Sequence, residues 1–390
     1  MDRPWVNRLR QQFPVTQKGA FFDISYENCG SLYMMEALAQ YLRDKADIAP
    51  HMAKNGGGGK GKTIDVIAGT RARLARFLGA AGPENIAFTA NTCQAISYAV
   101  MGLDYAPGDN IVVGAMEHVS VLMPCLNMRR FGVECRLVGA GSDLWVTADD
   151  LLAACNEHTK AVCVSYVQSC SGYRIDLEYL AEKCHERNIR VIVDAIQALG
   201  LVNVNFTALG IDALAGSGYK GMLATEGMGF LCLSPELTHS IKPLFACYNA
   251  GMTIDREKGE VVVTDEDDAR KLEAGTIPFM SIYVMNEALK RIEKLGMDNI
   301  SFHVSECFEK MYNGLTAAGY EIATPFESEH RCGSLLIKTG DAKALADFLE
   351  ERDIFVSEGK PGYVRVSAAP FTNEDDISRL VKAAEEYKNR

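Results

Sequence analysis

The strongest constraint on the fold is an alternation of short apolar runs with helical patterns in the first 250 residues. The apolar runs span residues 85–90, 110–116, 161–167 and 190–195. A stretch with helical character follows each of them, down to the short run IQALG after the fourth. Near-continuous apolar strands that alternate with amphipathic helices are typical of a parallel sheet covered on both faces. The sequence therefore predicts an α/β fold.

The rhythm changes after a last apolar run at 229–233. A polar, charged stretch at 253–275 comes next, followed by a helical segment at 281–295. Two short strand-like runs with helical patterns between and after them, at 334–339 and 363–368, indicate a smaller α+β unit.

We therefore expect three parts along the chain. They are an N-terminal segment over residues 1–20, a large domain over 21–250, and a small C-terminal domain with an interface segment over 251–390. The chain is long enough at 390 residues for two such domains.

Composition excludes several classes of function. The formal net charge of −11 argues against a nucleic-acid partner, which would require clustered lysine and arginine. No apolar stretch approaches the length of a membrane span, and the first residues lack a signal-peptide pattern, so we expect a cytoplasmic protein. The 12 cysteines are scattered without C-x-x-C pairs or zinc spacing, so we expect reduced thiols and no metal.

A glycine run raises the question of a nucleotide site. GGGGKGKT, residues 56–63, fits the pattern G-x-x-x-x-G-K-[ST] of a phosphate-binding loop. Such a loop is positioned by a buried strand, whereas a helical pattern ended by Pro50 precedes this run. We favour a glycine-rich connection at 56–61 that borders a site, with a nucleotide site as the alternative.

Two residues in the large domain point to a specific chemistry. Asp194 ends the apolar run VIVD, and ligands of open α/β sheets bind at the carboxyl ends of the strands. Lys220 lies in SGYKG, where glycines allow close approach of a ligand to the backbone. The alternatives are a capped helix start for Asp194 and a surface position for Lys220. A carboxylate for a pyridinium proton and a Schiff-base lysine are the groups that pyridoxal phosphate (PLP) chemistry needs most.

With this pair in place, the sequence resembles fold-type I PLP enzymes of the class V aminotransferase and cysteine desulfurase family. The resemblance covers roughly residues 21–385 and is nearest to the branch of selenocysteine lyases, C–S lyases and isopenicillin N epimerases. It implies a mostly parallel, aspartate aminotransferase-like large domain that binds PLP and a smaller α+β C-terminal domain.

The resemblance also implies how the cofactor ring would be held. In the V-D-x-x-Q element, Asp194 would bind the pyridine nitrogen and Gln197 the ring hydroxyl, with Gln168 at the position of the family's asparagine near that hydroxyl. Lys220 would form the Schiff base, and Tyr219 replaces the family's usual histidine.

Three further motifs would complete the cofactor site. In TANTCQA, Thr92 and Cys93 would hold the phosphate at a helix N-terminus, together with Ser217. In EHVS, His118 would stack on the ring and transfer protons, against the alternative of a structural histidine. In AGT, Gly275 and Thr276 would reach the partner's phosphate, which implies a homodimer.

The last motif concerns the substrate. Arg365 in YVRVS would bind the carboxylate of a small L-amino acid, against the alternative of an internal salt bridge. Cysteine desulfurases carry a nucleophilic cysteine shortly before this arginine, but no cysteine follows Cys332 in this chain. Cys332 itself begins a strand that we expect to be core.

These residues predict a desulfurase-like C–S (β) lyase without the persulfide cysteine. A class V aminotransferase and an amino-acid epimerase remain alternatives, because the same residues begin all three reactions. His118 favours the lyase branch, since an aromatic residue is common at that position in transaminases of this class. A PLP-fold protein that has lost catalysis is the alternative outside enzymes.

Overall fold

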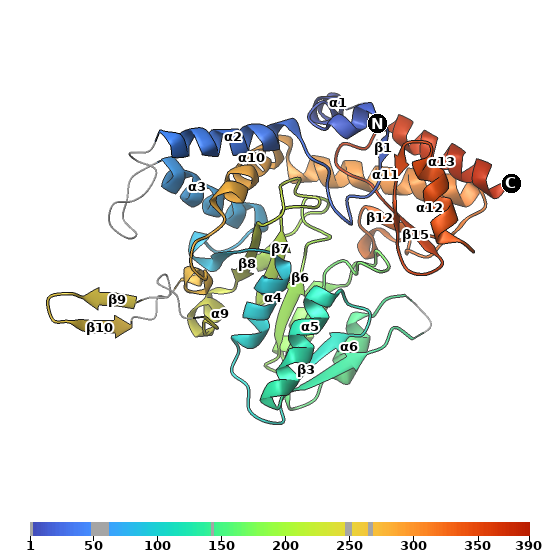
Figure 1. Ribbon diagram of the computed structural model, residues 1–390. Coiled ribbons are helices and arrows are strands. Elements are labelled where there is room, and N and C mark those ends of the chain that lie inside the picture. Colours follow the sequence, from blue (N-terminus) through green and yellow to red (C-terminus); the bar gives the residue numbers. More distant parts are fainter. Residues whose placement is uncertain (1–2, 48–61, 142–143, 246–251, 264–267) are drawn as a thin grey trace.

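The computed structural model describes residues 3–47, 62–141, 144–245, 252–263 and 268–390 (Figure 1). The glycine run at 56–61 and the expected domain boundary near residue 250 lie outside the described residues.

The centre of the molecule is a seven-stranded sheet with the order β2-β8-β7-β6-β5-β3-β4. Its strands are β2 (Ile86–Thr89), β3 (Asn110–Gly114), β4 (Glu134–Val138), β5 (Thr159–Ser165), β6 (Arg190–Asp194), β7 (Ala213–Ser217) and β8 (Gly229–Leu233). Only β8 runs against the other six, between β2 and β7. The expectation of a mostly parallel sheet is confirmed.

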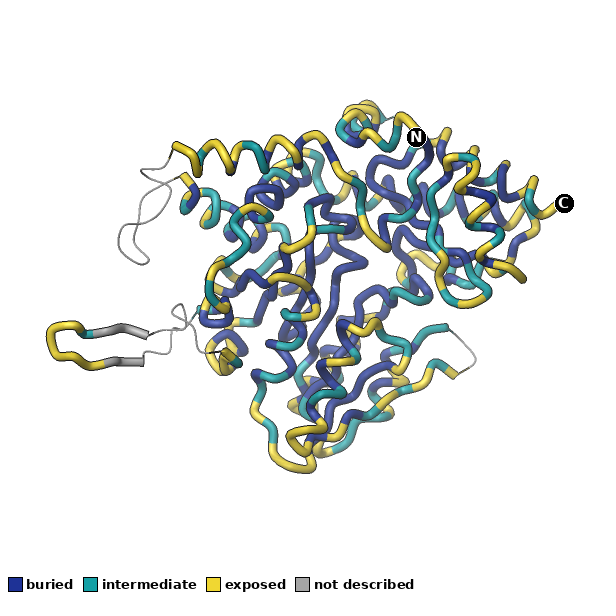
Figure 2. The backbone as a smooth tube through the Cα atoms, in the orientation of Figure 1, coloured by how far each residue is buried: buried dark blue, intermediate teal, exposed yellow. Residues whose placement is uncertain are grey.

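Alternate residues of the strands enter two separate hydrophobic cores. In β6, Val191 and Val193 belong to one core and Ile192 to the other. Side chains on a strand alternate between its faces, so a strand buried on both faces must be apolar throughout. Figure 2 shows these strands as the buried centre of the molecule.

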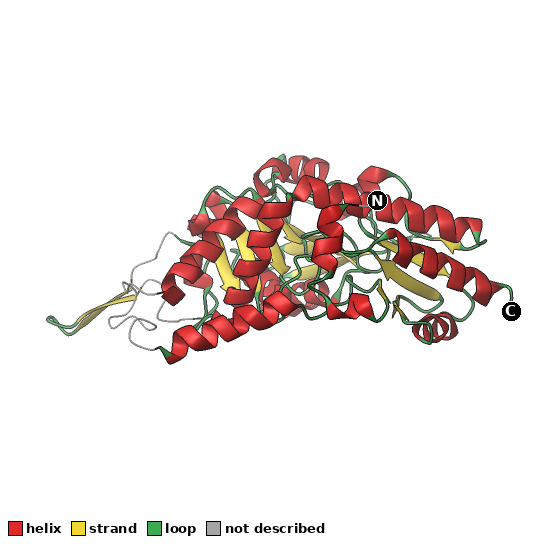
Figure 3. Ribbon diagram, turned by 90° about the horizontal axis from the view of Figure 1, so that it is seen from above, coloured by secondary structure: helices red, strands yellow, loops and turns green. Residues whose placement is uncertain are grey.

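Helices cover both faces, and Figure 3 shows the strands between them. One core contains residues of α2 (Leu32–Ala46), α3 (Lys62–Leu78), α6 (Ala148–Ala154), α7 (Leu177–His185), α8 (Phe206–Leu209) and α10 (Phe279–Leu295). The other contains residues of α4 (Thr92–Met101), α5 (Val119–Asn127) and α9 (Pro235–Ser240). Short 3₁₀ helices are η1 (Pro14–Gln17), η2 (Pro83–Asn85), η3 (Met128–Phe131), η4 (Ala269–Leu272) and η5 (Ser328–His330).

A second, antiparallel sheet lies toward the C-terminus, with the order β11-β12-β15-β14. Its strands are β11 (Glu321–Ile322), β12 (Ser334–Lys338), β14 (Ser357–Glu358) and β15 (Tyr363–Ser367). Residues of α11 (Met297–Ala317), α12 (Ala342–Glu350) and α13 (Glu374–Lys388) form the third core with it. No helix in the described ranges is both long and apolar enough to cross a membrane.

The beginning of the chain packs on its end. β1 (Ala20–Phe21) pairs in parallel with β13 (Ile354–Phe355), and α1 (Pro4–Arg10) carries Arg10, which forms an ion pair with Asp376 of α13. Phe13 stacks on Phe371 with ring centroids 4.3 Å apart. The N-terminal residues are thus held by the C-terminal part of the fold.

Several features differ from the sequence expectation or were not foreseen, among them the edge strand β4 and the helix α6, which had no predicted counterparts. Residues 195–200 after β6 form a turn and not a helix. The 21-residue helix α11 had no predicted counterpart. Part of the polar stretch forms a hairpin of β9 (Met252–Asp255) and β10 (Glu260–Val263), apart from the body of the molecule in Figure 1. The division of the chain at 1–20, 21–250 and 251–390 stays a prediction.

The lysine and threonine of the glycine-run motif have structural partners. Lys62 begins α3 and lies 3.5 Å from the Asp44 carboxylate of α2, while the Thr63 hydroxyl is 3.2 Å from that of Tyr283. The nearest described element before the run is the helix α2, so no strand in the described residues positions it as a phosphate loop.

Candidate active site

The site lies at the carboxyl edge of the central sheet, where several parallel strands end together. Asp194 ends β6 and is in register with Ser165, which ends β5, while Ser217 ends the neighbouring strand β7. The carboxyl ends of parallel strands form the usual ligand-binding edge of such a sheet.

Asp194 is 3% exposed. Its Oδ1 accepts a hydrogen bond from the Ile196 backbone N–H at 3.0 Å, and its Oδ2 accepts one from the Ser120 hydroxyl at 3.1 Å. Burial raises the pKa of Asp194, which Lys220, His118 and these hydrogen bonds oppose. Asp194 therefore caps a turn and not the expected helix, and its carboxylate remains beside the other predicted site residues.

Lys220 lies between β7 and β8 and is buried, which contradicts the surface alternative. Burial lowers the pKa of its ammonium to about 8, and the charge of Arg365 adds to this effect, against the carboxylates of Asp194 and Asp23. Such a lysine supplies a neutral amine near neutral pH, as nucleophilic lysines do.

The glycines around Lys220 are required by protein packing. A Cβ on Gly221 would lie 2.5 Å from the Leu199 carbonyl oxygen, and one on Gly218 would lie 2.6 Å from the Met285 methyl group. The sequence suggested close approach of a ligand to this backbone. In the structure, neighbouring protein atoms occupy that space.

His118 is the N-cap of α5 and lies on the open side of the site. Its Nδ1 is 2.8 Å from Ser120 Oγ and 3.2 Å from the Ser120 backbone nitrogen. Desolvation by the surrounding protein and the charges of Lys220 and Arg365 lower the pKa of His118, while Asp194 opposes them.

The residues predicted to bind the cofactor phosphate differ in accessibility. Thr92 begins α4 after the N-cap Asn91, and its buried Oγ1 has no hydrogen-bond partner among the described residues. Cys93 is exposed. The Ser217 hydroxyl donates to the Met228 carbonyl at 2.8 Å, so it must turn to reach a phosphate.

The two glutamines have different surroundings. Gln197 is buried and donates to the Ser25 carbonyl at 3.0 Å. Gln168 exchanges two hydrogen bonds with the backbone of Val146, at 2.6 and 3.0 Å. Its carboxamide thus joins two segments of backbone, and its predicted role near the ring hydroxyl stays a prediction. The Tyr219 ring centroid lies 5.7 Å from Lys220 Nζ.

Arg365 reaches the site from β15 of the second sheet. Its nearest carboxylate, Asp23, is 3.9 Å away, and its buried Nε has no hydrogen-bond partner among the described residues. Burial lowers the pKa of Arg365 and raises that of Asp23. A pair this long leaves the guanidinium able to bind a carboxylate, so the alternative of a closed internal salt bridge is not supported.

Gly275 and Thr276 are more accessible than Asp194 and Lys220. Gly275 has φ +79° with open space around it, so the turn itself favours glycine there. Thr276 is exposed on the chain's surface. Its predicted role in a partner's site stays a prediction.

The sequence did not single out four further residues of the site. Glu117 accepts from the Ser165 backbone at 2.9 Å, and burial raises its pKa to about 7. Asn28 donates to the Ala224 carbonyl at 2.7 Å and so ties the N-terminal segment to the Lys220 loop. Asp23 and Ser120 are the other two. Each was identifiable only through a partner distant in sequence.

The residues present fit PLP in two independent ways. The unpartnered Thr92 Oγ1 at the start of a ten-residue helix suits a phosphate, because helix N-termini favour anions. A buried carboxylate and a lysine with a lowered pKa suit a pyridinium and a Schiff base, respectively.

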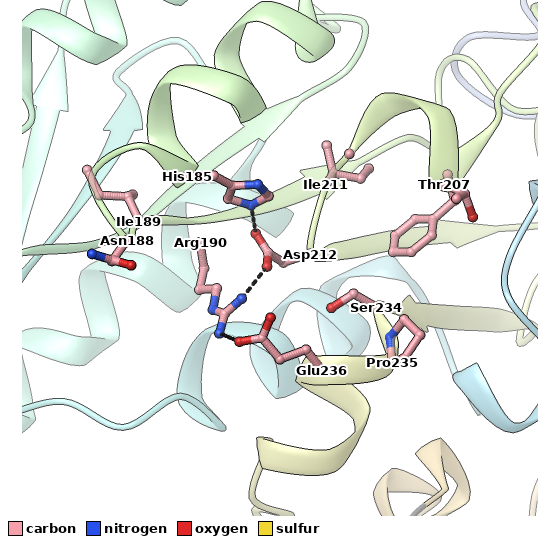
Figure 4. A pocket seen from close by; sticks show the side chains of 12 residues that line it. His185, Asn188, Ile189, Arg190, Thr207, Ile211, Asp212, Ser234, Pro235 and Glu236 are labelled. Carbon is pink, nitrogen blue, oxygen red and sulfur yellow. Dashed lines mark hydrogen bonds and ion pairs between the residues drawn. The ribbon is translucent and has the colours of Figure 1, made fainter.

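A separate cavity of about 620 Å³ lies at the opposite edge of the sheet (Figure 4). There Asp212 accepts hydrogen bonds from His185 at 2.9 Å, Arg190 at 2.8 Å and the Val191 backbone at 2.8 Å. Arg190 also pairs with Glu236. These charged groups pair with one another, so the residues that line the cavity form a structural ion-pair network.

Comparison with known proteins identifies the family. The profile described as Aminotransferase class-V matches residues 33–380. This chain belongs to the class V aminotransferase family. It is thus a PLP-dependent enzyme, and proteins described as cysteine desulfurases are among those it is similar to.

Individual members of the family are moderately similar in sequence and very similar in fold. A probable cysteine desulfurase of Methanothermobacter thermautotrophicus is 27% identical over 310 residues, which cover 78% of this chain and 74% of that protein. The apo structure of a cysteine desulfurase from Thermococcus onnurineus NA1 matches with a TM-score of 0.87 at 21% identity and covers 100% of this chain and 99% of that chain.

Another protein with a similar structure is the cystine C–S lyase C-DES. Its complex with cysteine persulfide matches with a TM-score of 0.86 at 20% identity, covering 96% of this chain and 99% of that chain. A variant of C-DES in which a lysine is replaced by alanine holds glycine covalently linked to the PLP cofactor. At these identities the structural matches show the shared fold.

Proposed function

We propose that this class V enzyme is a C–S (β) lyase that acts on cysteine or a related sulfur amino acid without a persulfide-forming cysteine of its own. The observation that carries the proposal is that residues 355–364, which precede the substrate arginine, contain no cysteine. Burial raises the pKa of Cys332 to about 11, and Cys332 is 3% exposed. It is therefore a poor sulfur acceptor.

The roles of the side chains follow from their surroundings. Arg365 binds the α-carboxylate of the amino acid with a guanidinium that Asp23 only partly neutralises. Lys220, as a neutral amine, removes the proton from the α-carbon. Asp194 keeps the ring nitrogen of the cofactor protonated.

PLP, when bound, stores the electrons released at the α-carbon. With the cofactor bound, loss of the α-proton would allow the β C–S bond to break. The sulfur would leave as sulfide from cysteine, as a thiol from a thioether or as a persulfide from cystine, and hydrolysis would convert the remaining three-carbon fragment to pyruvate and ammonia. The same residues permit reprotonation in place of elimination, which makes transamination and epimerisation the competing outcomes.

The proposal includes a homodimer with shared sites. Thr276 is exposed and Gly275 is half-buried in one chain, where a turn with positive φ presents them outward. They would contact the phosphate bound by the partner subunit.

The deciding experiment combines absorbance with product assays. Purified protein is mixed separately with L-cysteine, L-cystine and L-alanine, and the spectrum, pyruvate, sulfide and ketoacid are measured. We expect a cofactor band that Lys220→Ala abolishes and pyruvate from the sulfur amino acids without an added ketoacid. Lys62→Ala is the matched control and is expected to keep both, since Lys62 pairs with Asp44 at the surface.

Turnover that requires a ketoacid acceptor would instead indicate an aminotransferase, and inversion of the α-carbon an epimerase. A protein that forms no band with added PLP would contradict the whole assignment. ATP binding that survives Lys220→Ala but fails in Lys62→Ala would favour the nucleotide alternative.

A further inference from the structure

Ser120 lies between two residues of the proposed site. Its hydroxyl oxygen is 2.8 Å from His118 Nδ1 and 3.1 Å from Asp194 Oδ2. Ser120 is 8% exposed, whereas Asp194 comes from a strand 74 residues away in sequence. A buried hydroxyl thus bridges the histidine and the carboxylate.

The protons of this bridge have one consistent arrangement while Asp194 is ionised. A carboxylate only accepts hydrogen bonds, so the single hydroxyl proton of Ser120 is donated to Asp194. Toward His118 the hydroxyl oxygen can then only accept, and the proton must reside on Nδ1. This leaves the lone pair on Nε2, which has no hydrogen-bond partner among the described residues.

A second contact competes with the bridge. The backbone N–H of Ser120 lies 3.2 Å from the same Nδ1, and it binds only an unprotonated nitrogen. The side chain and the backbone of one residue therefore favour opposite tautomers of His118. The hydroxyl contact is the shorter of the two.

We propose that Ser120 is a positioning residue that links His118 to Asp194 and holds the imidazole proton on Nδ1. His118 consequently presents Nε2 as a proton acceptor. When Nε2 takes up a proton, the resulting positive imidazolium is hydrogen-bonded through Ser120 to the negative Asp194 carboxylate. This inference rests on the proposed roles of His118 and Asp194 and adds the residue that connects them.

The charges that face His118 come from three other elements. Asp194 of β6 favours the protonated ring, while Lys220 between β7 and β8 and Arg365 of β15 disfavour it. The positive end of α5 disfavours it as well, and Glu117 is adjacent in the chain. The Ser120 hydroxyl connects the favourable charge of Asp194 to the His118 ring through two hydrogen bonds.

The test reads the tautomer directly in cofactor-free protein labelled with ¹⁵N-histidine. His118→Asn assigns the signal among the seven histidines. We expect Nδ1–H in the unmodified protein and Nε2–H in Ser120→Ala, because the backbone N–H of residue 120 remains and takes over Nδ1. The pKa of the ring should fall by about half a unit or more in that variant.

Two variants control for structural damage. Ser120→Thr keeps a hydroxyl and is expected to restore the Nδ1–H tautomer. Ser165→Ala removes another buried hydroxyl, which donates to Glu117, and is expected to leave the tautomer unchanged. Alanine is a good helix former, so Ser120→Ala is compatible with the first turn of α5.

In the loaded enzyme, Ser120→Ala is expected to lower kcat at least about tenfold with little change in KM, as for a misplaced proton-transfer group. The same tautomer in the unmodified protein and in Ser120→Ala would overturn the proposal. Failure of the proposed function is seen separately, as the absence of a Lys220-dependent cofactor band, and it leaves the tautomer measurement intact.

Discussion

Lys220 is surrounded by two kinds of charge that act in opposite directions on its amine. Arg365 lowers its pKa, and Asp194 and Asp23 raise it, while burial sets the final value near 8. Residues outside the loop of Lys220 therefore influence the fraction of this lysine that is neutral at a given pH.

This balance predicts a pH dependence of cofactor loading. The neutral amine is the nucleophile, so the rate at which cofactor-free protein gains the absorbance band should rise with pH, with a midpoint near 8. Stopped-flow absorbance after mixing with PLP measures this rate. Arg365→Gln should move the midpoint up and Asp23→Asn should move it down, because they remove charges of opposite sign.

Lys62→Ala serves as the control and should leave the midpoint where it is. Shifts of Arg365→Gln and Asp23→Asn in the same direction would show that the two variants disturb the site by rearrangement and not by charge.

At the scale of elements, a glutamate side chain accepts a backbone hydrogen bond from the edge strand β2. The Phe88 backbone N–H donates to Glu273 Oε1 at 2.9 Å, and Arg71 donates to the same oxygen at 2.6 Å and to the Ile86 carbonyl at 2.5 Å. Arg71 also lies over the Phe88 ring. The segment after η4 is thus attached to the sheet edge, three residues before Thr276.

We expect Glu273→Gln to destabilise the fold by about 3 kcal/mol, because it leaves the Arg71 guanidinium buried without a counter-charge. Urea unfolding followed by circular dichroism measures this. Asp347→Asn on α12, which breaks an exposed pair with Lys343, is the matched control and should change stability by less than about 0.5 kcal/mol. Equal losses in the two variants would contradict the buried-pair account.

The sequence predicted the elements of the central sheet well and the connections poorly. Apolar runs such as 229–233 became strands because burial on both faces leaves no room for polar side chains. After Asp194, helical residues do not form a helix: Gly200 has φ +80°, and a Cβ there would overlap the Gly221 carbonyl group. A contact between two loops decides that turn, and no local pattern contains it.

Contacts between distant segments also explain which site residues could be predicted from the sequence and which could not. Asp194 and Lys220 were recognisable because strand ends and glycine-rich loops mark positions at a sheet edge. Ser120 is one serine in an apolar helix, and its meaning depends on Asp194. The hydrogen bonds between Gln168 and the Val146 backbone could not be foreseen either, because Val146 lies in a different loop.

On the scale of the whole molecule, the proposed shared site predicts complementation between two inactive variants. Lys220→Ala lacks the lysine, and Thr276→Asp would repel the partner's phosphate. A mixed dimer then contains one site with both residues intact. After random exchange of equal amounts, about a quarter of normal activity should return.

Subunit exchange is induced by mild denaturant and the pyruvate assay is repeated on the mixture. Lys220→Ala mixed with Asp194→Asn is the control, since both changes affect the same chain's site and no mixed dimer regains it. Activity of Thr276→Asp on its own, or no recovery in the mixture, would argue against shared sites.

The pairing of β1 with β13 has a consequence for how the enzyme is made. Asp23 follows β1 directly, and Arg365, its partner in the site, comes from β15, the last strand of the chain. During synthesis on the ribosome, β1 cannot pair with β13 until residues 354–355 have emerged. Asp194 and Lys220 are synthesised long before that, so a nascent chain would possess the residues proposed to hold the cofactor before the arginine proposed to bind the substrate.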